Sequence, residues 1–223
     1  MNISLTPRLS AVASLVKGGG IIADIGTDHG YLPIFLIENG RVSGAIAADI
    51  NKKPLENAKK SVSEYGLSEK IELRLSDGLR KFSEDDADEI IFAGMGGTLI
   101  AEKLAETPWI KKDNIHFIFQ PQSRAEDLRR FLFSNGFEIL EEKATHEGRR
   151  YYITFDAVYT GRHLPFSEGD CFIGKLPKTE DAKIHLSHQL SRLEEKCSAL
   201  SKLGEDISSL SQTISQIKEF INA

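Results

Sequence analysis

The sequence predicts an α/β fold with a mostly parallel sheet of seven strands and a pair of helices at the C-terminal end. Three observations support this fold class. Short apolar runs of β type alternate with helical patterns over the first two thirds of the 223 residues, as in parallel strands joined by helices. Little more than a turn separates the last two runs, which predicts an antiparallel pair. From about residue 178, apolar residues recur at alternating spacings of four and three, which is typical of helices that pack along one stripe.

The first predicted element is a helix that begins at Pro7, because Thr6 is a hydroxyl cap and proline fits the first helical position. Three glycines, at 18–20, end it. Strands are predicted at residues 21–25, 45–49, 71–75, 89–93, 116–120, 137–143 and 150–159. Each of the first five is expected to lead into turn residues and a helix, and helical patterns fit residues 31–39, 54–65, 98–106 and 124–135. The last two strands, with Glu147 and Gly148 at the turn, should pair antiparallel at the end of the sheet.

The C-terminal segment predicts two helices that share an apolar seam. Its repeating positions are Leu186, Leu190, Leu193, Cys197 and Leu200, followed by Ile207, Leu210, Ile214, Ile217 and Ile221. Gly204 lies between the two sets, which favours an antiparallel coiled-coil hairpin that buries its seam mainly on itself. One continuous helix that dimerises is the alternative.

Composition fits one globular domain with a smaller unit, and we expect boundaries at 1–161 and 162–223. Two cysteines are too few for a disulfide framework, and no basic flank precedes an apolar run near Met1, so a cytoplasmic location is expected. No apolar stretch approaches the roughly 20 residues of a membrane helix, which argues against a membrane-spanning role. The net charge of −5 argues against binding nucleic acid by bulk electrostatics but leaves a local basic patch open.

The most informative segment is Asp24-Ile25-Gly26-Thr27-Asp28-His29-Gly30. A buried strand, an acidic residue, a turn with two glycines and a helix start together predict a pocket for a nucleotide cofactor. The pattern differs from the Gly-x-Gly-x-x-Gly of dinucleotide enzymes and resembles the first motif of class I S-adenosylmethionine methyltransferases, with Asp28 in place of the middle glycine. A pyrophosphate prefers bare N–H groups, whereas Asp24 or Asp28 can meet the ammonium of S-adenosylmethionine.

Acidic residues also follow the second and third strands. Asp49 ends the second strand, where a carboxylate can accept both ribose hydroxyls of a nucleoside. Asp77, in Ser76-Asp77-Gly78, lies where adenine-binding side chains take the exocyclic amine. Any one such carboxylate is more often a cap or turn former. Acids at three successive strand ends favour a nucleoside pocket, and a dehydrogenase, which would also use Asp49, has no role for Asp28 or Asp77.

Glycines and amides follow the fourth and fifth strands. The run Gly94-Met95-Gly96-Gly97-Thr98 lets a planar ring or a methyl donor lie against backbone, and its alternative is a tight turn capped by Thr98. Gln120-Pro121-Gln122 is expected to present amides at the same rim, although such residues are often loop formers.

These motifs together resemble the bacterial tRNA (adenine-22-N1) methyltransferase family. The resemblance rests on residues 24–33, 93–97 and 120–121, preceded by Pro7-Arg8-Leu9 and followed by the helical tail. It implies a Rossmann-like class I methyltransferase fold, S-adenosyl-L-methionine as cofactor, and N1 of one tRNA adenine as acceptor. The sequence departs from the family pattern at Asp49, Gln122 and Tyr151-Tyr152, where Glu, Asn and Tyr-Glu are usual.

On this basis the candidate site residues fall into three groups. The expected catalytic residues are Asp28, His29, Gly94, Met95 and Gln120. The expected cofactor-binding residues are Asp24, Gly26, Thr27, Gly30, Asp49, Ile50, Ser76, Asp77, Gly78, Gly94, Met95 and Gly96. The expected substrate-binding residues are Arg8, Tyr31, Gln122, Arg124 and Arg149. No metal site is predicted, tRNA is the expected partner, and a monomer or weak dimer is expected.

Adenine N1 carries a lone pair at neutral pH, so positioning is the main catalytic task and no strong base is needed before attack. We assign Asp28 and His29 to acceptor orientation or to removal of the N6 proton, with a helix-capping His29 as the alternative. Arg8 is expected on a helix across the pocket mouth, where it binds a tRNA phosphate or a ligand carboxylate, and Tyr31 or Met95 would stack on the extruded base. Two other functions stay open: a methyltransferase for a small molecule or protein, and a non-catalytic nucleotide-binding module.

Overall fold

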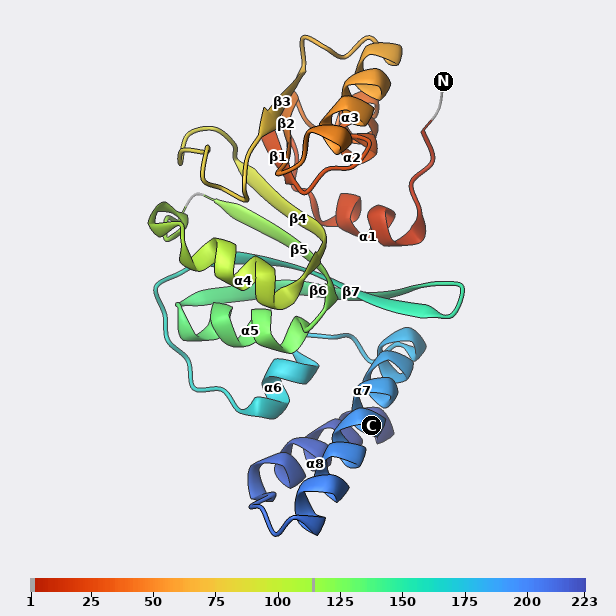
Figure 1. Ribbon diagram of the computed structural model, residues 1–223, viewed down its shortest axis with the longest axis vertical. Coiled ribbons are helices and arrows are strands. Elements are labelled where there is room, and N and C mark those ends of the chain that lie inside the picture. The colour runs from red at the N-terminus through yellow and green to blue at the C-terminus, as the bar shows by residue number, and fades with distance from the viewer. Residues whose placement is uncertain (1–2, 114) are drawn as a thin grey trace.

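A seven-stranded sheet in the order β3-β2-β1-β4-β5-β7-β6 forms the centre of the structure (Figure 1). The computed structural model describes residues 3–113 and 115–223. Its strands are β1 (Ile21–Ile25), β2 (Gly44–Asp49), β3 (Ile71–Leu75), β4 (Glu89–Gly96), β5 (His116–Ser123), β6 (Phe137–Glu147) and β7 (Arg150–Tyr159). Strands β1 to β5 are parallel where they pair, and β7 is antiparallel to both β5 and β6. The predicted fold class is confirmed.

Helices cover both faces of the sheet. The first five are α1 (Pro7–Leu15), α2 (Tyr31–Glu38), α3 (Lys52–Glu64), α4 (Gly97–Ala105) and α5 (Ala125–Ser134), with a short 3-10 turn at Pro108–Ile110. Successive residues of one strand serve opposite faces. In β1, Ile22 packs with α1 and α2, whereas Ala23 lies in the cluster that includes Ile100 of α4 and Leu128 of α5. Because both faces of the sheet are buried, the central strands are continuous apolar runs and show no alternation of apolar and polar residues.

The segment between β3 and β4 differs from the prediction of a helix after each of the first five strands. Residues 76–88 form turns instead. The Asp86 carboxylate accepts hydrogen bonds from the backbone N–H of Ser83 at 2.7 Å and from Arg74 Nη1 at 2.9 Å. A side chain that satisfies backbone donors locally competes with helix formation. The expected helix after the third strand is therefore wrong.

Local signals explain the other boundaries. Thr6 caps α1 as predicted, although the helix ends at Leu15, before the three glycines. The β6–β7 turn is Gly148-Arg149, one residue later than predicted. An unpredicted short helix, α6 (Glu168–Ile173), begins at a capping box formed by Ser167 and Asp170. In the described ranges, no helix has the length and apolar character required to cross a membrane.

The amino ends of the central strands are held by a buried charge network. His116 Nδ1 lies 2.6 Å from Glu89, and its Nε2 lies 2.9 Å from Asp156. Although burial opposes it, these two carboxylates raise the pKa of His116. Lys17 Nζ donates to Asp156 at 2.9 Å. Because this network lies at the edge of the sheet opposite the strand ends that carry the predicted motifs, we regard it as structural.

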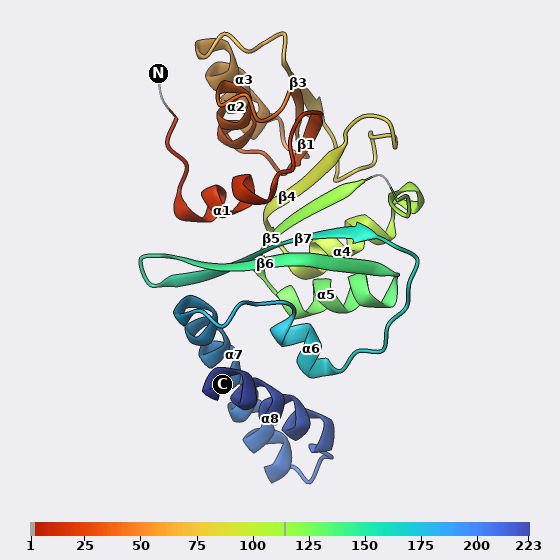
Figure 2. The same cartoon turned by 180° about the vertical axis from the view of Figure 1, so that it is seen from behind.

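The tail contains two helices, α7 (Glu180–Lys202) and α8 (Ser208–Asn222), which lie side by side in both views (Figure 1, Figure 2). Lys218 of α8 pairs with Glu194 of α7 at 2.7 Å. The chain thus has two tail helices and not one continuous helix, whereas their description as a coiled coil stays a prediction. The expectation that the seam is buried mainly within the tail is wrong for Leu186 and Ile217, which are fully buried in the same cluster as Phe155 of β7.

A buried ion pair also links α5 to the segment that precedes the tail helices. Arg129 of α5 donates to both carboxylate oxygens of Glu142 in β6, at 3.0 and 2.8 Å. Its Nη1 also donates to the backbone carbonyls of Cys171 and Phe172 at 2.9 and 3.0 Å. Since those carbonyls lie in α6, one guanidinium joins α5, β6 and α6 beneath the tail.

Replacing a tail leucine should therefore destabilise the whole protein. We expect Leu186→Ala to lower the free energy of unfolding by about 2–5 kcal/mol, because the side chain is fully buried in the core. Leu203→Ala is the matched control: its side chain is 77% exposed, and its effect should stay within about 0.5 kcal/mol. Urea unfolding of both variants tests this. Equal stabilities would mean that the tail is an independent unit.

Candidate cofactor and acceptor site

The loops after β1 to β5 lie at one edge of the sheet, because these strands are parallel neighbours. Most of the predicted site residues are in these loops or in the last residues of the strands. Three come from elsewhere: Arg8 from α1, Tyr31 from the start of α2 and Arg149 from the β6–β7 turn.

Backbone hydrogen bonds hold the loop after β1 against β2. The backbone N–H groups of Gly26 and Thr27 both donate to the carbonyl of Ala48 in β2, at 2.8 and 2.9 Å. Gly26 has φ of 85°, and a Cβ there would lie 3.2 Å from Met95 Sδ. Gly30, with φ of 68°, is the N-cap of α2. Both glycines thus have the left-handed conformation that side chains disfavour, and the absent Cβ of Gly26 lets Met95 lie close to the backbone.

Asp24 is a buried carboxyl one residue before the end of β1. Burial raises its pKa to about 6, although a hydrogen bond with Thr27 and the positive charge of Arg8 act in the opposite direction. Ionising this group in a buried position costs free energy unless another cation compensates. The end of β1 therefore holds a buried carboxyl whose charged form a nearby cation would stabilise.

The Asp24→Asn variant should be more stable than the wild type at neutral pH. The folded-state pKa, about 6, lies above the ordinary 3.8, so the stability from this group is fully present below pH 3.8 and is lost as pH rises through 6. We expect Asp24→Asn to raise the free energy of unfolding at pH 7.5 by about 1–3 kcal/mol. The gain should shrink on lowering the pH to 4. Urea unfolding at both pH values checks this, and a pH-independent difference would contradict it.

The ends of β2 and β3 present exposed apolar side chains beside a carboxylate. Asp49 accepts a hydrogen bond from the backbone N–H of Asn51 at 2.6 Å. Ile50 is 59% exposed and Leu75 is 37% exposed. Exposed aliphatic side chains beside a carboxylate offer a surface that a planar ring can cover.

Asp77 is already paired within the protein. Lys103 of α4 approaches its two carboxylate oxygens at 2.9 and 3.0 Å. A Cβ at Gly78 would lie 2.8 Å from the Lys103 side chain, so this glycine permits the ion pair. The hydroxyl of Ser76 donates to the Gly78 carbonyl at 2.9 Å and so shapes the turn. These three predicted cofactor residues therefore form a turn that Lys103 holds, a partner that local sequence did not indicate.

Strands β4 and β5 extend further than predicted, so the segments around residues 94–97 and 120–123 pair with each other at the end of the sheet. Met95 pairs with Pro121 and Gly96 with Ser123, across two register shifts. A Cβ at Gly97 would collide with the backbone carbonyl of Arg124, so only glycine fits there. Thr98 is not the helix cap: Gly96 is, and the Thr98 hydroxyl donates to Asp127 at 2.9 Å.

Asp28, His29 and Tyr31 form an exposed cluster at the start of α2. His29 Nε2 lies 3.5 Å from Asp28 Oδ2, and the side chains are 41% and 72% exposed. The His29 ring stacks on Tyr31 with centroids 5.1 Å apart. Since the N-cap of α2 is Gly30 and no side chain caps the helix, His29 does not cap it. Both polar groups remain accessible from solvent.

Gln120 is fully buried, so the expectation that its amide faces the rim is wrong. The cause is Arg8, whose Nη1 donates to Gln120 Oε1 at 2.7 Å and covers it. Gln120 Nε2 donates to the Pro121 carbonyl at 3.3 Å. Arg8 itself is half-buried, with its guanidinium 5.9 Å from the Tyr152 ring centre.

The remaining predicted substrate residues lie on the outer side of the rim. Gln122 is exposed, and Arg124 Nε donates to Asp127 at 2.7 Å. Arg149 is at the tip of the β6–β7 hairpin. Strand β7 pairs with β5 only through residues 155–158, so the rest of the hairpin projects beyond the carboxyl edge of β5 (Figure 2).

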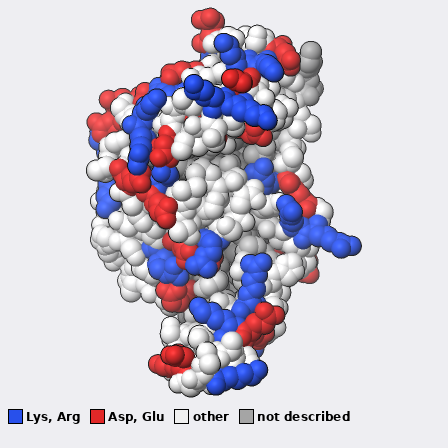
Figure 3. Space-filling model, viewed as in Figure 1, with Lys and Arg blue, Asp and Glu red and all other residues white. Residues whose placement is uncertain are grey.

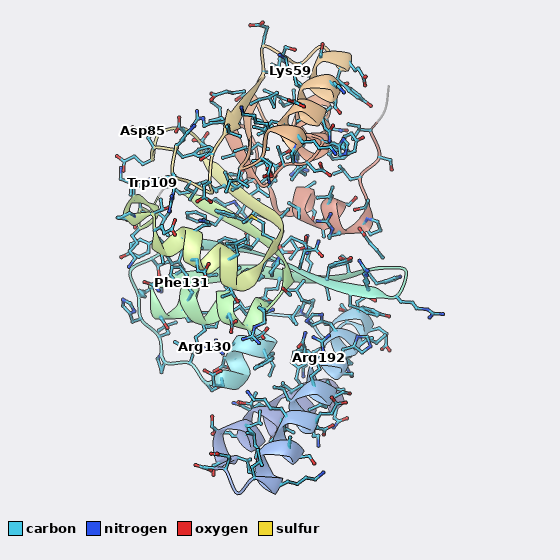
Figure 4. All side chains as sticks on the ribbon, in the orientation of Figure 1. Lys59, Asp85, Trp109, Arg130, Phe131 and Arg192 are labelled. Atoms are coloured by element: carbon cyan, nitrogen blue, oxygen red, sulfur yellow. The ribbon has the colours of Figure 1, made fainter. Side chains whose placement is uncertain are left out.

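A groove of about 870 Å³ runs from the acceptor rim to the tail and was missed by the sequence analysis. It is lined at one end by residues 121–127 and at the other by basic side chains of α7: His185, His188, Arg192 and Lys196. Blue side chains gather on this part of the surface (Figure 3), and Arg130 and Arg192 approach the gap from opposite sides (Figure 4). Spacings of three and four place these α7 residues on one helix face, which is the signal that indicates them.

Burial has a large effect on one of these groups. It lowers the pKa of His185 to about 4, and the charge of Arg129 acts in the same direction. His185 is therefore neutral at physiological pH. The charged lining of this groove combines cations with acids: Arg124, Arg130, Arg192 and Lys196 with Glu126, Asp127, Glu168 and Asp206. Arg124 pairs with Asp127 and Arg130 pairs with Glu168, so the cations on the α7 side are Arg192 and Lys196. Among the described residues, no group of three or more His, Cys, Asp or Glu side chains is arranged to hold a metal ion.

Known proteins share both sequence and fold with this chain. Residues 5–155 match the family described as a methyltransferase domain. The tRNA (adenine(22)-N(1))-methyltransferase of Bacillus subtilis (strain 168) is 35% identical over 169 residues, which cover 73% of this chain and 71% of that protein.

Solved structures extend the similarity to nearly the whole chain. A Streptococcus pneumoniae protein in complex with S-adenosyl-L-methionine is 33% identical, with a TM-score of 0.84 over 98% of this chain and 100% of that one. TrmK of M. capricolum, in complex with S-adenosyl-homocysteine, is 28% identical, with a TM-score of 0.78 over 98% of each chain. Since these matches include the tail, the similarity is not confined to the sheet.

Proposed function

Because this chain belongs to the methyltransferase-domain family and, within it, to the family of tRNA (adenine(22)-N(1))-methyltransferases, we propose that it transfers a methyl group from S-adenosylmethionine to N1 of adenine 22 in tRNA. The observation that carries the proposal is the glycine cradle after β1, with acids at the ends of β1, β2 and β3, in a chain that matches such an enzyme over 73% of its length. A cytoplasmic location and a monomer or weak dimer are part of the proposal.

The residues at the strand ends fit the donor. Gly26 leaves room for close approach to the backbone, and Asp24 or Asp28 would meet the donor ammonium. Asp49 would accept the ribose hydroxyls. The exposed side chains of Ile50 and Leu75 would cover the adenine ring, with Asp77 at its exocyclic amine. When bound, S-adenosylmethionine supplies an electrophilic methyl group on sulfur.

Positioning carries most of the proposed mechanism. The N1 lone pair of adenine can attack the methyl group directly, so the protein must hold the ring in line with it. The residues 94–97 loop would support the ring, because its glycines let the ring approach the backbone. The methylated ring is cationic until N6 loses a proton, so a carboxylate near N6 stabilises charge that develops during transfer. Asp28 would provide that carboxylate, and the accessible imidazole of His29 would accept the proton.

The target adenine must leave its stack to reach this edge of the sheet, at a cost of a few kcal/mol. The groove along α7 and the hairpin tip with Arg149 flank the acceptor loops on two sides. We propose that Arg149 and the α7 cations bind the tRNA backbone on either side of the extruded base, as local basic groups on a chain of net charge −5. The helical unit of residues 162–223 would thus serve substrate binding and the unit of residues 1–161 catalysis.

The test is mass mapping of modified nucleosides after incubation with unmodified tRNA and S-adenosylmethionine. We expect one N1-methyladenosine, located at position 22, and none in a tRNA that carries guanine there. Methylation of another nucleotide would contradict the acceptor assignment. Donor binding without any transfer to tRNA would favour a different substrate.

A further inference from the structure

Arg8 is a half-buried arginine that forms no ion pair with a carboxylate of the described residues. Its guanidinium can only donate hydrogen bonds, so the amide oxygen of Gln120 must face it, as observed at 2.7 Å. The backbone N–H of Arg8 donates to Glu147 at 2.8 Å, which fixes the start of α1 to β6. The guanidinium is thus held in one place, while its other N–H groups find no acceptor among the described residues.

This cation faces the donor side of the site. A Cβ at Gly94 would lie 4.0 Å from Arg8 Nη1, so the guanidinium lies beside the end of β4. Strand β4 pairs directly with β1, whose Asp24 is within electrostatic reach of Arg8. A buried acid and an unpaired arginine therefore lie near each other at the motif that would receive the amino-acid end of the donor.

We propose that Arg8 binds the carboxylate of the methyl donor and that Gln120, buried beneath it, is the positioning residue that aims the guanidinium. This rests on the proposed function. The amino-acid end of S-adenosylmethionine is a zwitterion, and the site offers both complementary charges: an aspartate for the ammonium and Arg8 for the carboxylate. A planar guanidinium matches a carboxylate with two parallel hydrogen bonds.

An RNA phosphate is the other anion that an arginine here could meet, and the structure favours the donor. The Arg8 side chain turns inward to a fully buried amide. The hairpin tip at Arg149 and the cations of α7 lie further out, where a phosphate backbone can reach them. Phosphate contacts position a nucleic acid on a protein, and these exposed cations can make them.

Calorimetry with two ligands tests the proposal. S-adenosylmethionine carries the carboxylate, whereas 5′-methylthioadenosine lacks the whole amino-acid end. We expect Arg8→Ala to raise the Kd for S-adenosylmethionine about 10- to 100-fold and to leave the Kd for 5′-methylthioadenosine within about twofold. Arg8→Lys should lose less, because it keeps the charge but not the planar fork. Gln120→Glu is nearly isosteric and should also weaken the binding of S-adenosylmethionine but not of 5′-methylthioadenosine. The new carboxylate would pair with Arg8 and compete with the donor carboxylate for it.

Arg162→Ala is the matched control, since it removes an exposed arginine from the segment before α6 and should change neither affinity. Thermal unfolding without ligand checks that each variant is folded. Unchanged S-adenosylmethionine binding in Arg8→Ala, with weaker and less salt-dependent tRNA binding, would assign Arg8 to a phosphate and overturn the proposal. Equal losses for both ligands would also overturn it. If the Arg8 variants lose S-adenosylmethionine affinity as expected but the wild type transfers no methyl group to tRNA, the proposed function is refuted and the role of Arg8 in donor binding stands.

Discussion

A Gly26→Val variant is expected to lose S-adenosylmethionine binding by at least about 100-fold and to lose methyl transfer with it. Gly26 has φ of 85°, and a Cβ there would already lie 3.2 Å from Met95 Sδ. The two γ-methyl groups of valine would extend further into the space that the donor needs. Calorimetric titration with the donor measures the loss.

Backbone strain must be separated from this steric effect. Gly66 has φ of 67°, and a Cβ there would meet nothing within 4 Å. Gly66→Val therefore introduces similar strain, of order 1–3 kcal/mol, away from the pocket. We expect it to lower the melting temperature and to leave donor affinity unchanged. A folded Gly26→Val protein that binds the donor as tightly as the wild type would refute the placement of the pocket.

Much of this site could be predicted because its signals are local. A glycine two residues after a buried acid, at the end of an apolar run, indicates a tight turn, and Gly26 and Gly30 do have positive φ. The order of apolar runs likewise predicts the parallel sheet, since both faces of its strands are buried. Neither inference needs a residue distant in the chain.

The parts that could not be predicted depend on distant partners. Asp77 pairs with Lys103, 26 residues away, and Gln120 is covered by Arg8, 112 residues away. No local pattern indicates either contact. The tail seam has the spacing of a self-contained hairpin, yet Leu186 packs in the core because α7 lies against β6 and β7. The helix after β3 was expected from the alternation of strands and helices, and that alternation does not indicate the turn that Asp86 forms with the Ser83 N–H.

Asp28→Asn is expected to lower kcat by about 10²–10³-fold while the Kd for S-adenosylmethionine changes little. The side chain is 72% exposed at the rim and lies 3.5 Å from His29, so its charge is available to an incoming base. Asparagine keeps the shape and removes the charge that would stabilise the cationic ring. His29→Ala should lower kcat by about 10²–10⁴-fold if the imidazole accepts the N6 proton. Single-turnover methylation of tRNA at saturating donor measures both.

The double variant decides whether Asp28 and His29 act together. Groups that act as a unit show non-additive losses, so the double variant should be no slower than the worse single one by more than a few fold. Asp85→Asn, in the exposed loop between β3 and β4, is the matched control and should behave as wild type. A weaker donor affinity in Asp28→Asn at normal kcat would assign this carboxylate to the donor ammonium. Wild-type turnover in both single variants would remove the pair from the mechanism and leave positioning by the residues 94–97 loop as the source of catalysis.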